Sequence, residues 1–246
     1  MEPGSRLWEI DCARGIAILM MVVFHTVFDI SFFRIAPVDV TGGFWRYFAY
    51  ATATLFLLVV GVSLIVSHAR SRQKLSGLSL AKKFVLRGAG IFMLGLLVTL
   101  GTYLYLHEGY VVFGILHLIG VAVMLSPLFF RFREKNILIG LLIVIAGVCL
   151  SGIHGPAYLI PLGIFPASFV SVDYTPLLPW LGVVLIGMGI GEFLYRDGAR
   201  QFSIRRLPDL ALAPLSFLGR HSLVIYLVHQ PVIILLLAAV TGTPVF

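Results

Sequence analysis

The sequence is poor in charged residues. Only 12% of its 246 residues are Asp, Glu, Lys or Arg, whereas 59% are hydrophobic. A soluble domain usually has about 25% charged residues. So few charges cannot cover the surface of a water-soluble protein of this length, which excludes a soluble enzyme, a nucleic-acid-binding module and a disordered chain. The composition therefore predicts an all-α integral membrane protein that resides in the lipid bilayer.

Cysteine is scarce as well. Cys12 and Cys149 lie in different apolar stretches, a pattern that argues against a disulfide framework and against a thiolate metal site. The seven histidines show no HxxxH spacing within a helix, which is the spacing that brings two imidazoles to one metal ion. We therefore expect no metal and no permanently bound cofactor.

Long apolar runs dominate the chain. A membrane helix needs about 20 mostly apolar residues. By this measure the sequence predicts a polytopic bundle of about seven transmembrane helices in one domain over residues 1–246, at 12–33, 44–67, 84–106, 112–130, 137–153, 177–195 and 215–240. The segment 154–176 is apolar but contains four prolines, so it is expected to form either a re-entrant or a surface-lying loop.

The distribution of positive charge fixes the predicted orientation. With the N-terminus in the cytosol, sixteen of the eighteen Lys and Arg residues fall on the inner side, and only Arg34 and Arg46 fall outside. Inner loops of membrane proteins carry such an excess. The C-terminus is therefore expected outside, and the net charge of +7 reflects topology and not binding to nucleic acid.

Glycines are concentrated in the third and sixth apolar runs. The sixth contains Gly187-Met-Gly-Ile-Gly191, which resembles a dinucleotide-binding fingerprint only superficially. No strand is expected before it, and small residues at such spacing are typical of close helix packing in membranes. We therefore predict that these glycines pack helices together.

The first apolar run carries four ionisable residues, Asp11, Arg14, His25 and Asp29. At about 100° per residue they fall within roughly 60° of one helix face. Ionisable groups at membrane depth cost at least ~2.5–3.5 kcal/mol each, so they are functional candidates. The i, i+4 spacing of His25 and Asp29 predicts that the carboxylate orients the imidazole, which then acts as a base.

Further polar residues recur in the other runs. Ser222, Tyr226 and His229 share one face of the last predicted span, Gln230 lies beside them, and His117 lies at a comparable outer depth. Asp173, in the outer loop, could approach from above. We predict supporting or acceptor-side roles for His117, Asp173, Tyr226, His229 and Gln230. For His117, a plain hydrogen bond between helices is an equally good interpretation.

Several basic residues lie at the inner ends of the spans. Together they could form a cationic entrance for a phosphorylated cytosolic ligand. Arg14 and His25 are eleven residues apart, or roughly 16 Å along a helix. A ligand with a charged head and a long thin arm, such as acyl-coenzyme A, would suit this distance. The predicted binding residues are Arg14, Lys82, Lys83, Arg87 and Arg220.

Several segments resemble a known family. The run from Arg14 to His25 is similar to the arginine-to-histidine signature of transmembrane acyltransferases. The chain most resembles the prokaryotic branch of the heparan-alpha-glucosaminide N-acetyltransferase catalytic-domain family. The resemblance extends over 8–11, 24–29, 55–61, 113–117, 173–180 and 218–231.

This resemblance implies a function. Acetyl-coenzyme A would be the co-substrate, bound from the cytosol, and the acceptor would lie on the far side of the cell membrane. His25 would be the catalytic residue, and the protein would form a homodimer. We expect the chain to lack the large lumenal N-terminal domain and the extra spans of eukaryotic relatives. The expected acceptor is therefore an amine or hydroxyl of an amino sugar or cell-envelope glycan, and not heparan sulfate itself.

Two other functions are compatible with the same residues. Intramembrane His and Asp are frequent in proton-coupled transporters and permeases. The absence of an evident inverted repeat argues against a transporter. A non-catalytic scaffold fits least well, because a scaffold has no need for aligned ionisable groups on its first helix.

Overall fold

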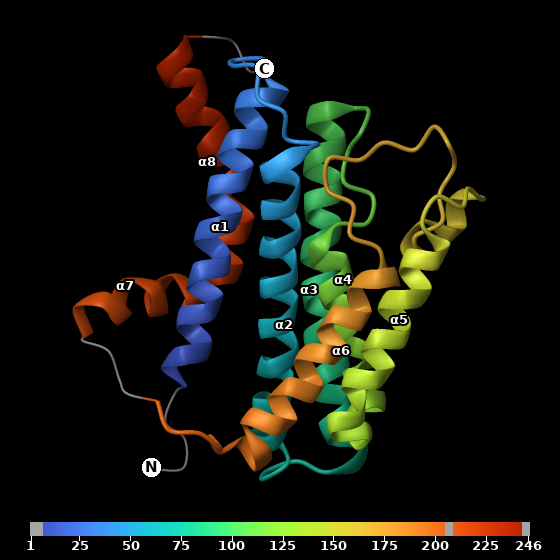
Figure 1. Ribbon diagram of the computed structural model, residues 1–246, viewed down its shortest axis with the longest axis vertical. Coiled ribbons are helices and arrows are strands. Elements are labelled where there is room, and N and C mark those ends of the chain that lie inside the picture. Colours follow the sequence, from blue (N-terminus) through green and yellow to red (C-terminus); the bar gives the residue numbers. More distant parts are fainter. Residues whose placement is uncertain (1–6, 205–208, 243–246) are drawn as a thin grey trace. The chain divides into compact units, whose positions relative to one another are not determined.

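Apolar runs of 15 to 30 residues form the main helices of the computed structural model, which describes residues 7–204 and 209–242 (Figure 1). In the described residues the chain is α-helical without β-strands; short 3-10 helices and two isolated bridges complete the secondary structure. The α-helices are α1 (Trp8–Phe32), α2 (Gly43–Ser71), α3 (Gly77–Leu106), α4 (Ile115–Phe129), α5 (Asn136–Leu150), α6 (Leu177–Leu194), α7 (Asp209–Arg220) and α8 (Ser222–Thr241).

Six helical stretches of the described residues are long and apolar enough to cross a membrane. The chain is therefore a multi-pass membrane protein. One stretch, Ile115–Leu150, contains both α4 and α5. At Arg133 its backbone leaves the helical region (φ 48°, ψ −126°), and Figure 1 shows α4 and α5 running in opposite directions. The spans predicted at 112–130 and 137–153 are the two arms of this hairpin.

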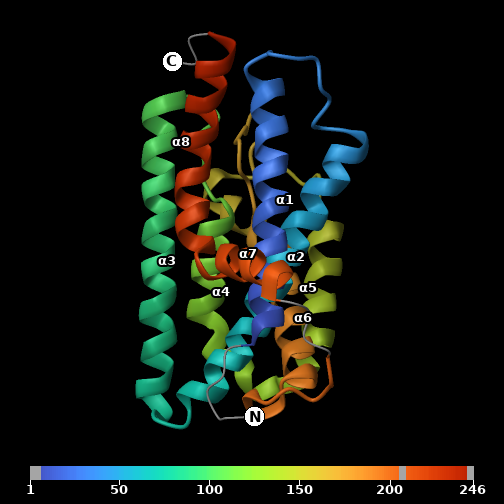
Figure 2. The same cartoon turned by 90° about the vertical axis from the view of Figure 1, so that its left-hand side faces the viewer.

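The last predicted span is wrong at its beginning. Residues 215–220 belong to α7, which ends at Arg220, and the apolar helix α8 starts only at Ser222. Figures 1 and 2 show α7 lying across the direction of α1 and α8. The run Gly219-Arg220-His221-Ser222 interrupts the apolar sequence at this corner, but the predicted span extends across it. A helix with a polar and an apolar face that lies across the spans is typical of the membrane interface.

The chain forms two compact units, divided within α2 between Phe56 and Leu57. The first unit contains α1, the beginning of α2, α7 and α8. In this unit α1 packs against both α7 and α8. Gly15 and Gly219 permit close approach, because a Cβ at Gly219 would lie 1.8 Å from the Asp11 carbonyl oxygen.

The second unit contains the rest of α2 and α3 to α6. Its strongest pairings are α3 with α4 and α5 with α6. Glycines allow these backbones to touch, as a Cβ at Gly182 would lie 2.5 Å from the Gly140 carbonyl oxygen. The prediction that glycines pack the helices is thus confirmed at Gly182 and Gly187, whereas a Cβ at Gly90 would meet nothing within 4 Å.

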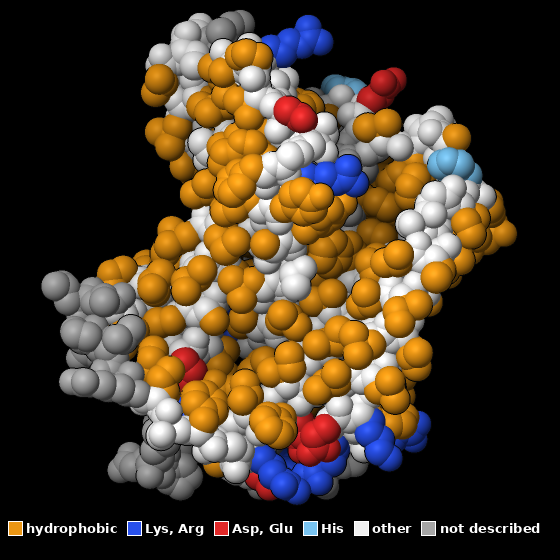
Figure 3. Space-filling view, in the orientation of Figure 1, with side chains coloured by type: hydrophobic (Ala, Val, Ile, Leu, Met, Phe, Trp, Pro, Cys, Tyr) orange, Lys and Arg blue, Asp and Glu red, His pale blue; other side chains and the backbone are white. Residues whose placement is uncertain are grey.

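Charge is segregated along the second unit. Figure 3 shows hydrophobic side chains over α5 and α6, with Lys and Arg side chains gathered at the lower end of these helices. The turn Phe130–Lys135 and the short helix Arg196–Gly198 lie at this end and carry several of these basic residues. Such a distribution agrees with the predicted cytosolic side.

The proline-rich segment 154–176 folds as an ordered loop with one short 3-10 helix, Ala157–Leu162. It is attached to the connection between α3 and α4: the Val172 amide donates to the Gly109 carbonyl, and the Thr175 amide donates to that of Phe113. Burial raises the pKa of Tyr174 to about 12, so its hydroxyl keeps its proton and donates to the Ile160 carbonyl at 2.7 Å.

The contact between α5 and α6 gives a first prediction. Gly182→Ala should lower the melting temperature, because the added methyl group must separate two backbones that touch; overpacking costs about 1–3 kcal/mol. Gly90→Ala, on an open face of α3, is the control and should leave the melting temperature unchanged or raise it. Equal melting temperatures of the two variants in detergent would contradict this account of the packing.

Candidate active site

His25 projects from the polar face of α1, and its surroundings fix its chemical form. The side chain is half-buried, and its Nδ1 atom lies 2.9 Å from the Met21 carbonyl oxygen one turn earlier. A carbonyl only accepts hydrogen bonds, so Nδ1 must carry the proton. Nε2 of the neutral ring therefore holds the lone pair and can act as a base or nucleophile.

Asp29 lies one turn further along α1 and is almost fully buried, at 2% exposure. Its Oδ1 atom accepts a hydrogen bond from Gln230 Nε2 of α8 at 2.7 Å. The predicted contact between Asp29 and His25 is not formed, and this corrects the role given to the carboxylate. The backbone carbonyl of Met21 orients the imidazole, whereas the carboxylate joins α1 to α8.

Helix α8 brings a second imidazole to the same place. His229 is buried, and its ring centroid lies 4.8 Å from that of His25, with 69° between the ring planes. Its Nδ1 atom lies 2.6 Å from the Tyr226 carbonyl oxygen, which fixes the same tautomer as in His25. The Tyr226 ring packs beside His229 at 5.5 Å. The predicted grouping of these residues with His25 is therefore present.

The buried polar cluster of α1 and α8 is rich in hydrogen-bond acceptors. Asp29 Oδ2 and Gln230 Oε1 are buried and have no hydrogen-bond partner among the described residues. A buried acceptor without a donor costs roughly 1–3 kcal/mol. A ligand group that carries several N–H or O–H donors would remove this cost, so the cluster is suited to binding such a group.

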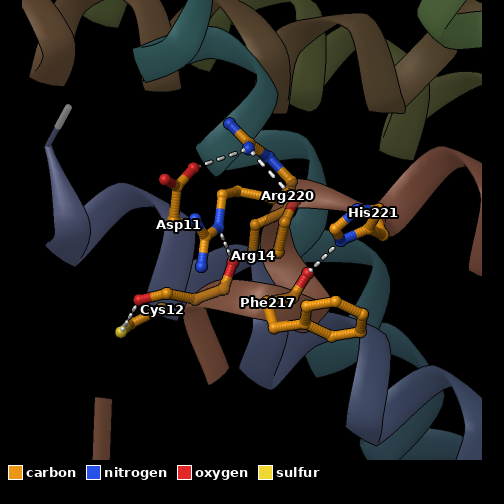
Figure 4. A network of polar contacts seen from close by, with 8 residues as sticks. Asp11, Cys12, Arg14, Phe217, Arg220 and His221 are labelled. Carbon is orange, nitrogen blue, oxygen red and sulfur yellow. Dashed lines mark hydrogen bonds and ion pairs between the residues drawn. The ribbon is translucent and has the colours of Figure 1, made fainter. Parts of the chain in front are cut away.

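At the other end of α1, Arg14 connects α1 to α7. Its Nη1 atom donates to Asp11 Oδ1 at 3.2 Å and to the Gly219 carbonyl at 3.3 Å (Figure 4). Gly219 is in the last turn of α7, where carbonyls are otherwise unsatisfied and a cation is favourable. Arg220 is exposed and donates through Nε to the Ser216 carbonyl. Arg14 thus has a structural role, and its role in binding acyl-coenzyme A stays a prediction.

The other predicted cationic residues are in the second unit, at the beginning of α3. Lys83 Nζ donates to Ser71 Oγ at 2.5 Å, and Arg87 Nη1 lies 3.4 Å from Ser67 Oγ, so both face the end of α2. Lys82 is exposed. Their role in ligand binding stays a prediction.

His117 and Asp173 belong to the second unit and cap the N-terminus of α4. His117 is 1% exposed; its Nδ1 atom accepts from the Gly114 amide at 3.2 Å, and Nε2 lies 3.4 Å from Thr99 Oγ1. Asp173 Oδ2 accepts from the Ile115 amide at 3.1 Å. These bonds satisfy amides at the helix start that lack partners within the helix. The contacts support the structural interpretation of His117, and an acceptor-side role stays a prediction for both.

Sequence reasoning did not single out Glu192, which lies near the end of α6. Its side chain is 11% exposed and accepts a hydrogen bond from Arg133 Nε at 2.9 Å. Beside it is a cavity of about 300 Å³, lined by Glu134, Glu192, Phe193, Leu194, Arg196, Gln201 and Phe202. The sequence did contain a reason to single out Glu192, because it is the only acidic residue in the sixth apolar run.

Fold and site together define a multi-pass membrane protein with a buried polar cluster on its first and last spans. The family of heparan-alpha-glucosaminide N-acetyltransferase catalytic domains matches residues 6–231. Because the match covers most of the chain, the protein belongs to this family, which indicates a transmembrane acetyltransferase. The chain has no significant match among curated proteins or solved structures.

The capping role of His117 gives a second prediction. His117→Ala should destabilise the protein by about 1–3 kcal/mol, because the Gly114 amide loses its acceptor in a buried position. His154→Ala, at an exposed histidine, is the control and should melt like the wild type. An unchanged melting temperature of His117→Ala together with a loss of activity would instead assign this residue to catalysis.

Proposed function

We propose that the protein transfers an acetyl group from acetyl-coenzyme A to an amino group of an amino sugar or cell-envelope glycan. The donor enters from the cytosol, and the acceptor binds in the outer half of the cell membrane. Membership of the acetyltransferase family favours this reaction over a proton-coupled transporter. The observation that carries the proposal is the polar cluster of α1 and α8, in which His25 Nε2 holds a lone pair and Asp29 Oδ2 and Gln230 Oε1 are buried without hydrogen-bond donors.

The length of α1 supports a donor with a long arm. The helix is continuous from Trp8 to Phe32, so Arg14 and His25 are separated by roughly 16 Å along its axis. Arg14 and the exposed Arg220 would attract the phosphates of the donor. For Lys82, Lys83 and Arg87, which belong to the second unit, a role in donor binding rests on their predicted cytosolic position in the sequence alone.

The polar cluster favours an amine over a hydroxyl as acceptor. Asp29 Oδ2 and Gln230 Oε1 both require donors. An ammonium group brings three N–H donors and a positive charge, whereas a hydroxyl brings one donor. Asp29 would hold the ammonium by charge and Gln230 would accept a second bond, so the pair fits an amino group best.

In the proposed reaction His25 acts at the thioester. Once the held ammonium has lost a first proton, Nε2 removes a second proton from the nitrogen as it attacks the acetyl carbonyl. The C–S bond then breaks, and the leaving coenzyme A thiolate takes this second proton. Alternatively, Nε2 attacks first and carries the acetyl group to the amine in a second step. Both routes require the tautomer that the Met21 carbonyl fixes. Proximity of donor and acceptor at one base supplies much of the rate enhancement.

The first test concerns His25. His25→Ala should lower acetyl transfer from labelled acetyl-coenzyme A to glucosamine by at least 10²-fold, a typical contribution of a positioned base. Thermal stabilisation by acetyl-coenzyme A should persist, because the donor phosphates bind elsewhere. His107→Asn, at an exposed loop histidine, is the control and should transfer acetyl at the wild-type rate. Near-normal transfer by purified His25→Ala would refute the assignment.

The second test concerns the donor site. Arg220→Gln should raise the KM for acetyl-coenzyme A roughly tenfold with little change in kcat, because one charge-assisted contact to phosphate is lost. Arg46→Gln removes an exposed arginine on the predicted outer side and is the matched control. If both variants had the same KM, the phosphates would have to bind elsewhere.

A further inference from the structure

The two imidazoles of the cluster share one feature that a single catalytic base does not require. His25 and His229 each have Nδ1 bonded to a carbonyl of their own helix, at 2.9 and 2.6 Å. Each neutral ring therefore has its lone pair on Nε2. With the ring centroids 4.8 Å apart, the structure holds two bases side by side. In this form His229 cannot donate from Nε2 to a developing oxyanion.

The proton balance of the proposed reaction requires that two protons leave the acceptor nitrogen. A primary amine is largely protonated at neutral pH, and R–NH3⁺ with acetyl-S-CoA gives R–NH-acetyl, HS-CoA and H⁺. The nitrogen starts with three protons and keeps one in the amide. Two protons therefore leave it in each turnover, one of which ends on the coenzyme sulfur and the other in water. A hydroxyl acceptor would lose a single proton.

We propose that His229 is the second catalytic base and removes the first of these protons; the inference rests on the proposed function. His229 Nε2 takes a proton from the ammonium held by Asp29 and Gln230, which leaves a lone pair on nitrogen. This lone pair forms the C–N bond at the thioester carbonyl, and His25 Nε2 takes the second proton. The C–S bond breaks with its electron pair on sulfur, His25 returns its proton to the thiolate, and His229 releases its proton to water.

The surroundings of His229 are consistent with a proton-accepting role. The printed contacts of His229 include the His25 ring of α1 and the Tyr226 ring of its own helix, and the neighbouring Gln230 bonds to Asp29 of α1. Arg220, the last residue of α7, and His221, at the corner before α8, are exposed and lie two turns or more from His229 along the chain. Asp29 is the one acidic group of this cluster, and Gln230 holds it directly.

The test measures the rate of acetyl transfer to two acceptors, each with the wild type and with His229→Asn. Asn keeps an N–H group but has no basic atom. With glucosamine near neutral pH, His229→Asn should be at least tenfold slower than wild type, and its rate should rise about tenfold per pH unit up to the pKa of the amine. With an aminophenyl glycoside, whose aromatic amine is uncharged at neutral pH, the variant should stay within about twofold of the wild type. His25→Ala should lose activity with both.

The outcomes are separable. An unchanged rate with glucosamine, or an equal loss with both acceptors, would overturn the role of His229. If wild type acetylated neither amine, the proposed function itself would fail. If His229→Asn did not fold, His229→Ala with added imidazole takes its place, and imidazole should restore the glucosamine rate only. His154→Ala is the control and should match wild type with both acceptors.

Discussion

The constraint on which the site depends is the cost of polar groups inside a membrane. Helix α1 carries a carboxylate that is almost fully buried, and it can remain there only because α8 supplies the Gln230 amide at 2.7 Å. This one hydrogen bond connects residues 201 positions apart in the chain. It aligns α8 beside α1 and so brings His229 against His25. The polar cluster and the packing of the two helices have the same physical origin.

The helix backbone also determines the chemistry of the imidazoles. A histidine within a helix has a backbone carbonyl three or four residues earlier within reach of its Nδ1 atom. Both His25 and His229 use this carbonyl, and both therefore present Nε2 as the basic atom. No carboxylate is needed for orientation, which leaves Asp29 available to hold the positive charge of an acceptor.

The second unit uses similar residues for a different purpose. His117 and Asp173 satisfy amides at the beginning of α4, and glycines such as Gly182 allow α5 and α6 to touch. Where no water reaches a helix end, its amides need acceptors from the protein itself, so such caps contribute to stability. The same residue types thus form a polar cluster in one unit and cap a helix in the other, and only their contacts distinguish the two arrangements.

The sequence by itself determined the membrane class, the approximate spans and the polar face of α1, and it predicted the orientation. Each depends on local composition or on helical periodicity, which a linear pattern contains. The family resemblance, carried by short motifs, was readable in the same way. Only the tertiary structure decided that α7 ends at Arg220 before α8 begins, that Asp29 bonds to Gln230 and not to His25, and that His117 caps a helix. These facts depend on which distant group reaches a buried polar atom first, and residue spacing along one helix cannot specify that.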